Sequence, residues 1–131
     1  MTPNAHLFVY GSLMSRFQNP ATELLRANAV LLGEATMRGF LYEIDWYPGA
    51  VYESSTPACV YGELWQINDE AALWPILDDY ETVDSDQPGK ESYDRRQVEV
   101  LHKNEPFLAW VYLYNLPTAG LKRIESGRFE G

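Results

Sequence analysis

Stretches that favour β-strands follow one another along most of this 131-residue chain, with few helical segments between them. Parallel neighbours in a sheet need a long crossover connection, usually a helix, whereas antiparallel neighbours are joined by short turns. The order of segments therefore predicts an α+β domain. We expect a small mixed, mainly antiparallel sheet that curls toward a barrel, with flanking helices. The strand-like stretches are 7–10, 29–44, 50–54, 58–67, 93–102 and 107–115.

Helix signals occur in two places. Asn19-Pro20 is typical of a helix start, because proline at the first helical position needs no amide donor, and a short helix is expected to follow. The segment 70–81, EAALWPILDDYE, has apolar residues at helical spacing. Pro75 lies inside this second segment, so a kink or a late restart of the helix is expected there.

Glycines and turn residues divide the strand-like stretches. Gly33 and Gly39 interrupt the long stretch 29–44 and indicate bulges or sharp bends. The stretches 93–102 and 107–115 alternate around the connection KNEP, which predicts an antiparallel hairpin.

Composition limits the classes of function. The length suits one domain over residues 1–131, and a hydrophobic content of 46% is typical of a packed globular domain. Ten basic against nineteen acidic residues give a net charge of −9, which disfavours nucleic acid and anionic membranes as partners. No apolar run is long enough for a membrane helix, and MTPNAH lacks a signal-peptide pattern, so a cytoplasmic protein is expected.

The chain offers few residues for metal or redox chemistry. Its one cysteine, Cys59, excludes an internal disulfide, and its apolar surroundings favour a buried strand position over a nucleophile. With one cysteine and two histidines, a zinc site of the usual ligand set is not expected.

The first strand-like stretch runs into YGSL, residues 10–13. Glycine after a strand allows a tight turn whose successive backbone amides form a concavity suited to an anion. The amides of Gly11, Ser12 and Leu13 are therefore candidates to bind a carboxylate, with Tyr10 as a wall of the site. An ordinary strand-ending turn explains the same letters.

A second candidate is the acidic segment LDDYE, residues 77–81. Its carboxylates suit a solvated helix end, but Glu81 precedes a loop, where a side chain can turn inward. Apolar walls favour the neutral form of a carboxyl and raise its pKa toward the range of a general base.

A third candidate is Arg95. In the strand-like stretch 93–100, Tyr93 and Arg95 share a face. An inward Arg95 needs a carboxylate partner, and a structural ion pair is favoured there over substrate contact.

Together these segments resemble the gamma-glutamylcyclotransferase-like superfamily, in particular its small AIG2-like members. The similarity covers most of the chain and consists of short motifs in the family's order and spacing. The matching residues are Tyr10 to Leu13, Asn19, Tyr47 to Gly49, Gly62 to Leu64, Leu77 to Glu81, Tyr93, Arg95, Val98, Val100, Tyr112, Tyr114 and Ile124 to Gly127.

The resemblance implies a small mixed barrel and an enzyme that converts a gamma-glutamyl compound to 5-oxoproline and an amine. It further implies that Tyr10, Gly11, Ser12 and Leu13 bind the glutamyl group and that Glu81 is the acid/base. The small-molecule gamma-glutamyl substrate supplies its own nucleophile, the α-amine, so no metal or cofactor is required.

Two alternatives remain open. Many relatives have glycine after the catalytic glutamate where this chain has Thr82, and the polar loop 82–92 is long. The same pocket is therefore also compatible with a non-catalytic protein that binds a gamma-glutamyl or other carboxylate metabolite. A protein-interaction module that uses the tryptophans is the least favoured reading. The leaving amine and the oligomeric state are not predicted.

Overall fold

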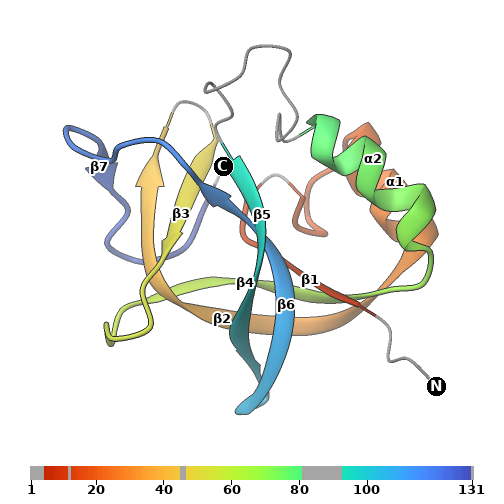
Figure 1. Ribbon diagram of the computed structural model, residues 1–131, viewed down its shortest axis with the longest axis horizontal. Coiled ribbons are helices and arrows are strands. Elements are labelled where there is room, and N and C mark those ends of the chain that lie inside the picture. Colours follow the sequence, from red (N-terminus) through yellow and green to blue (C-terminus); the bar gives the residue numbers. More distant parts are fainter. Residues whose placement is uncertain (1–4, 12, 45–46, 81–92, 131) are drawn as a thin grey trace.

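The computed structural model describes residues 5–11, 13–44, 47–80 and 93–130. Its elements, in chain order, are β1 (His6–Val9), α1 (Pro20–Asn28), β2 (Ala29–Glu43), β3 (Pro48–Tyr52), β4 (Cys59–Ile67), α2 (Glu70–Tyr80), β5 (Tyr93–His102), β6 (Glu105–Tyr114) and β7 (Lys122–Arg123). Figure 1 shows the strands wrapped around one another, with α1 and α2 side by side against one flank of the sheet.

The strands form a closed, mainly antiparallel barrel. Their order is β3-β2-β4-β1-β6-β5, and a further pairing between β2 and β5, at Thr36 and Leu101, closes the ring. Only β1 and β6 run parallel among the described pairs, in register at Leu7 and Trp110. The mixed, mainly antiparallel α+β barrel expected from the sequence is thus confirmed.

Two glycines shape the long strand β2, as the sequence predicts. The pairing with β4 shifts register between Leu31 and Gly33, which marks a bulge. From Gly39 onward β2 pairs with β3 instead of β4. Gly39 has a φ of 153° and a β-carbon there would lie 2.0 Å from the Val51 carbonyl oxygen, so only glycine fits at this change of partner.

The helix starts also follow the sequence. The Asn19 side chain accepts a hydrogen bond from the Thr22 amide at 2.9 Å, and the Thr22 hydroxyl accepts one from the Asn19 amide at 3.0 Å, with Pro20 at the first helical position. Asp69 caps α2 through the Ala72 amide. The helix continues through Pro75 to Tyr80, so the late restart considered at Pro75 is not observed.

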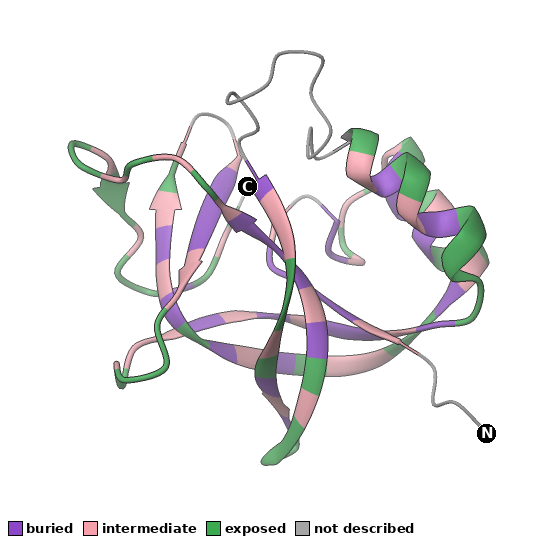
Figure 2. Ribbon diagram, viewed as in Figure 1, coloured by how far each residue is buried: buried purple, intermediate pink, exposed green. Residues whose placement is uncertain are grey.

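Alternation along β1 divides the core into two parts. Leu7 and Val9 pack with α1 and α2 in the helix-side cluster, whereas Phe8 and Tyr10 pack inside the barrel. Figure 2 shows buried residues alternating with more exposed ones along the strands. Because β1 contributes to both clusters, the segment that follows it is fixed by packing on both sides.

One expectation needs correction, and one segment adds a strand that the sequence did not indicate. Cys59, predicted at a buried strand position, is the first residue of β4 and is only half-buried. The C-terminal segment, which shows no clear periodicity, contains β7 and continues along the barrel: the Ile124 amide donates to Leu41 and the Tyr61 amide to Gly127.

Candidate active site

Tyr10, the residue after β1, is anchored through its hydroxyl inside the barrel. Its side chain is 5% exposed. The hydroxyl donates to the carbonyl of Tyr112 at 2.5 Å and accepts from the amide of Ala50 at 3.1 Å. These bonds join the end of β1 to β6 and β3, so Tyr10 fixes where the following bend begins.

Tyr10→Phe tests this anchor. The variant leaves a buried amide and a buried carbonyl without the hydroxyl, so we expect the free energy of unfolding to fall by about 1–3 kcal/mol. Urea unfolding measures the change. Tyr42→Phe, at a half-buried position of β2, is the matched control, and equal losses in the two variants would contradict the anchoring role.

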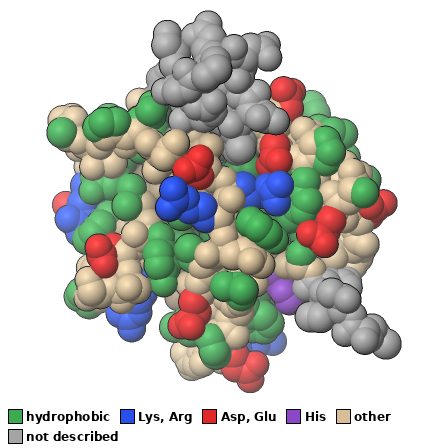
Figure 3. Space-filling model, in the orientation of Figure 1, with side chains coloured by type: hydrophobic (Ala, Val, Ile, Leu, Met, Phe, Trp, Pro, Cys, Tyr) green, Lys and Arg blue, Asp and Glu red, His purple; other side chains and the backbone are tan. Residues whose placement is uncertain are grey.

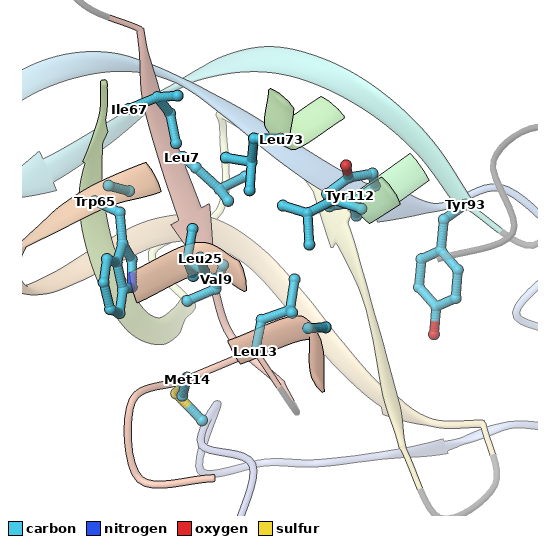
Figure 4. Close-up of a cluster of buried hydrophobic side chains, with 13 residues drawn as sticks. Leu7, Val9, Leu13, Met14, Leu25, Trp65, Ile67, Leu73, Tyr93 and Tyr112 are labelled. Atoms are coloured by element: carbon cyan, nitrogen blue, oxygen red, sulfur yellow. The ribbon is translucent and has the colours of Figure 1, made fainter. Parts of the chain in front are cut away.

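The chain turns directly after Tyr10. The Met14 amide donates to the Gly11 carbonyl at 3.0 Å, which closes a turn over residues 11–14. Leu13 is 3% exposed and packs in the helix-side cluster, where Figure 4 shows it with Met14 near Val9 and Leu25. Ser12 lies outside the described residues, so carboxylate binding by these amides stays a prediction.

Tyrosines surround the start of β3 beside this bend. A β-carbon on Gly11 would lie 3.2 Å from Pro48, whose carbonyl accepts a hydrogen bond from the Tyr93 hydroxyl at 2.7 Å. The Tyr93 ring lies 6.5 Å from the ring of Tyr47 and 5.8 Å from that of Tyr114. Such rings offer apolar faces with polar tips next to the bend.

Glu63 of β4 binds Ser15, the residue that follows the turn over residues 11–14. Its two carboxylate oxygens accept hydrogen bonds from the amide and the hydroxyl of Ser15, both at 2.6 Å. Sequence reasoning placed Glu63 in a family motif but did not foresee Ser15 as its partner, because the two residues lie 48 positions apart. The one sequence signal for this contact is the alternation of apolar and polar residues along β4, which predicts that the Glu63 side chain faces away from the core.

Glu63→Gln is expected to destabilise the protein by about 1–2 kcal/mol, because glutamine keeps only one acceptor oxygen and loses the charge. Glu34→Gln is the matched control, since Glu34 pairs with Glu63 directly across the β2–β4 ladder. Like charges opposite one another are unfavourable, so the control should be neutral or slightly stabilising. Thermal unfolding compares the two variants, and equal effects would contradict the role of Glu63.

Glu81 lies outside the described residues, as do Trp46, Thr82 and the loop 82–92. The structure describes α2 up to Tyr80, and its last turn contains Asp78. The role of Glu81 as acid/base therefore stays a prediction, and the described residues establish the surroundings of Asp78 instead.

Asp78 and Arg95 form a two-point ion pair between α2 and β5. Arg95 Nε donates to Asp78 Oδ1 at 2.8 Å and Nη2 donates to Oδ2 at 3.1 Å. Both side chains are about one-fifth exposed. The prediction that Arg95 has a carboxylate partner in a structural ion pair is confirmed.

Tyr112 contacts both parts of the candidate site. Its hydroxyl donates to Asp78 Oδ1 at 2.8 Å, while its backbone carbonyl accepts the hydrogen bond from Tyr10. The bend after β1 and the last turn of α2 are thus linked through one residue of β6. Sequence reasoning singled out Tyr112 as part of a motif but not as this link.

Metal-ligand groups, membrane-spanning helices and shifted pKa values are further features that bear on function. The described residues contain no group of three His, Cys, Asp or Glu side chains suited to a metal ion, and no helix among them is long and apolar enough to cross a membrane. Burial lowers the pKa of His6, and hydrogen bonds from Ser55 lower the pKa of Glu53; neither residue belongs to the bend or to α2. On the face drawn in Figure 3, Lys and Arg lie scattered among other residues.

The described residues form a small closed α+β barrel with two helices against one flank. The chain matches the gamma-glutamyl cyclotransferase, AIG2-like family over residues 7–131 and belongs to that family.

The similarity to individual relatives covers almost the full length of both chains. The gamma-glutamylcyclotransferase family protein YtfP of Escherichia coli K12 is 34% identical over 122 residues, which cover 92% of each chain, and its Citrobacter rodentium counterpart is 34% identical over 124 residues, 94% of this chain and 93% of that one. The solution structure of the E. coli protein ytfP superposes with a TM-score of 0.66 over 95% of this chain and 96% of that one, at 34% identity. An AIG2-like protein from Mus musculus has the same fold, with a TM-score of 0.72 over 99% of this chain and 92% of that one, at 24% identity.

Proposed function

We propose that this protein is a gamma-glutamyl cyclotransferase that converts a small gamma-glutamyl compound to 5-oxoproline and releases an amine or amino acid, with Glu81 as general acid/base. The observation that carries the proposal is the link through Tyr112. It joins the bend that begins at Tyr10 to the turn of α2 that contains Asp78, three positions before Glu81 in the sequence. Membership of the family supports enzymatic activity of this class.

In the proposed reaction the substrate attacks itself. The α-amine forms a bond to the side-chain carbonyl carbon and closes a five-membered ring, and the bond from that carbon to the leaving nitrogen breaks. Attack within one molecule removes much of the entropic barrier once the substrate is held bent. The amides of Gly11, Ser12 and Leu13 would hold the α-carboxylate, and Tyr10 would fix their position.

The proposed reaction includes two proton transfers, from the α-amine and to the leaving nitrogen, and one acid/base group can perform both. An α-amine with a pKa of about 8 is mostly protonated at neutral pH, so it must lose a proton before it attacks. The Glu81 carboxylate would accept that proton and return it to the leaving nitrogen as the bond breaks. No bound metal or cofactor enters this sequence of steps.

A 5-oxoproline assay tests the proposal. Wild type and Glu81→Gln are incubated with a panel of gamma-glutamyl amino acids, amines and peptides. Turnover by wild type that is lost in the variant supports the proposal. Calorimetric binding without turnover across the panel would instead favour a non-catalytic binder, for which Thr82 and the loop 82–92 are the motivating sequence features.

A further inference from the structure

A cluster around Asp78 ties the last described turn of α2 to two strands. We define the Asp78 cluster as Asp78, Arg95 and Tyr112 with the two tryptophans that contact Arg95. Asp78 Oδ1 accepts hydrogen bonds from both Arg95 Nε and the Tyr112 hydroxyl, each at 2.8 Å, and Oδ2 accepts from Arg95 Nη2 at 3.1 Å. Both carboxylate oxygens are therefore engaged.

The tryptophans restrict the guanidinium further. The Arg95 Cζ atom lies 4.2 Å from the ring centre of Trp74 on α2 and 4.9 Å from that of Trp110 on β6. The two indoles meet edge to face, with centroids 6.2 Å apart. Stacking and two-point hydrogen bonding both depend on the planar guanidinium, which lysine lacks. The position of α2 relative to β5 and β6 is thus fixed from several directions.

Two features distinguish this cluster from an ordinary stabilising ion pair. Tyr112 connects the Asp78 cluster to Tyr10. Its hydroxyl donates a hydrogen bond to Asp78, and its backbone carbonyl accepts one from the Tyr10 hydroxyl. In addition, both side chains are only about one-fifth exposed, and removing charges from water offsets much of the attraction between them, so net stabilisation alone does not account for this pair.

We propose that Asp78, Arg95 and Tyr112 are positioning residues for the reaction proposed above. They hold the end of α2 and the bend after Tyr10 in one fixed relation, so that the acid/base group that follows α2 and the substrate-binding amides act on the same molecule. This inference rests on the proposed function for its catalytic part. Misplacement of reacting groups by about 1 Å costs about 100-fold in rate, so a positioning defect appears in kcat.

The chain offers a matched control next to Arg95. Arg96 pairs with Asp94 at 3.2 Å, but the Arg96 side chain is 65% exposed. Arg95→Met and Arg96→Met remove the same charge from adjacent residues of one strand. We expect Arg95→Met to lower kcat by about 10- to 100-fold with little change in KM, whereas Arg96→Met leaves both nearly unchanged because exposed pairs contribute little. Arg95→Lys, which keeps the charge, should recover part of the kcat.

A double variant separates position from stability. Arg95→Met alone leaves the Asp78 carboxylate without its cationic partner, so the melting temperature falls. Adding Asp78→Asn removes that unpaired charge and should restore most of the melting temperature. Under the proposal kcat stays low in the double variant, because the helix end is no longer fixed. Recovery of kcat together with stability would overturn the proposal.

Hydrogen exchange gives a readout that needs no substrate. We expect faster exchange of the Met14 amide and of amides in the last turn of α2 in Arg95→Met, but not in Arg96→Met. If Arg95→Met fails to fold, Tyr112→Phe serves instead, since it removes one hydroxyl and keeps the carbonyl bonded to Tyr10. Unchanged exchange in Arg95→Met, or in Tyr112→Phe where that variant serves, overturns the positioning role. Changed exchange without wild-type turnover would support the coupling between α2 and the bend, and would overturn its catalytic part together with the proposed reaction.

Discussion

Glu81→Gln is expected to lower the rate of 5-oxoproline release by about 100- to 10,000-fold, while the protein stays folded. Glutamine matches glutamate in size but neither takes a proton from the α-amine nor returns one to the leaving nitrogen. The rate is measured with saturating gamma-glutamyl substrate from the panel, and circular dichroism and thermal unfolding verify the fold.

Asp79→Asn is the matched control for that measurement. Asp79 lies in the last turn of α2, two positions before Glu81 in the sequence, and is exposed, so its loss changes the net charge by the same amount without touching the proposed chemistry. Its turnover should remain close to that of wild type. Full activity of Glu81→Gln would remove Glu81 from the mechanism, and equal losses in both variants would assign the effect to charge alone.

Gly62→Ala is expected to cost about 3 kcal/mol of unfolding free energy, the largest stability effect among the variants considered. A β-carbon at Gly62 would lie 2.1 Å from the Val9 carbonyl oxygen and 2.9 Å from Phe8 Cζ. The first of these atoms belongs to the backbone of β1, so no side-chain rotation relieves the clash. Either β1 or β4 has to move.

Urea unfolding measures this loss, with Cys59→Ala as control on the same strand at a half-buried position. Val9 directly precedes Tyr10, so a Gly62→Ala protein that relieves the clash by a shift of β1 carries a displaced bend. In that case we also expect weaker binding of the proposed gamma-glutamyl substrate. Gly62→Ala that unfolds at the same urea concentration as wild type would contradict the close approach of β1 and β4.

Local signals in the sequence were sufficient for most of the architecture. Period-two alternation and short connections predicted the mainly antiparallel barrel, and Asn19-Pro20 predicted the start of α1. Arg95 was expected to have a carboxylate partner, since a charge on an inward strand face requires one, and Asp78 provides it.

Contacts between residues far apart in the chain could not be predicted from local sequence patterns. Nothing local indicates that Ser15 meets Glu63, that Tyr112 links Tyr10 to Asp78, or that the C-terminal segment pairs with the barrel. Those contacts depend on strand order and register, which the alternation pattern leaves open. Ser12 and Glu81 lie outside the described residues, so their roles remain predictions.

The parallel pairing of β1 with β6 has a consequence for biosynthesis. Tyr10 and the carbonyl that holds it are 102 residues apart. While a ribosome elongates the chain, the first strand therefore waits unpaired on that side until the last long hairpin has emerged. Contacts this distant in sequence are associated with slow folding, so we expect the bend after Tyr10 to reach its anchored position only once β6 has formed.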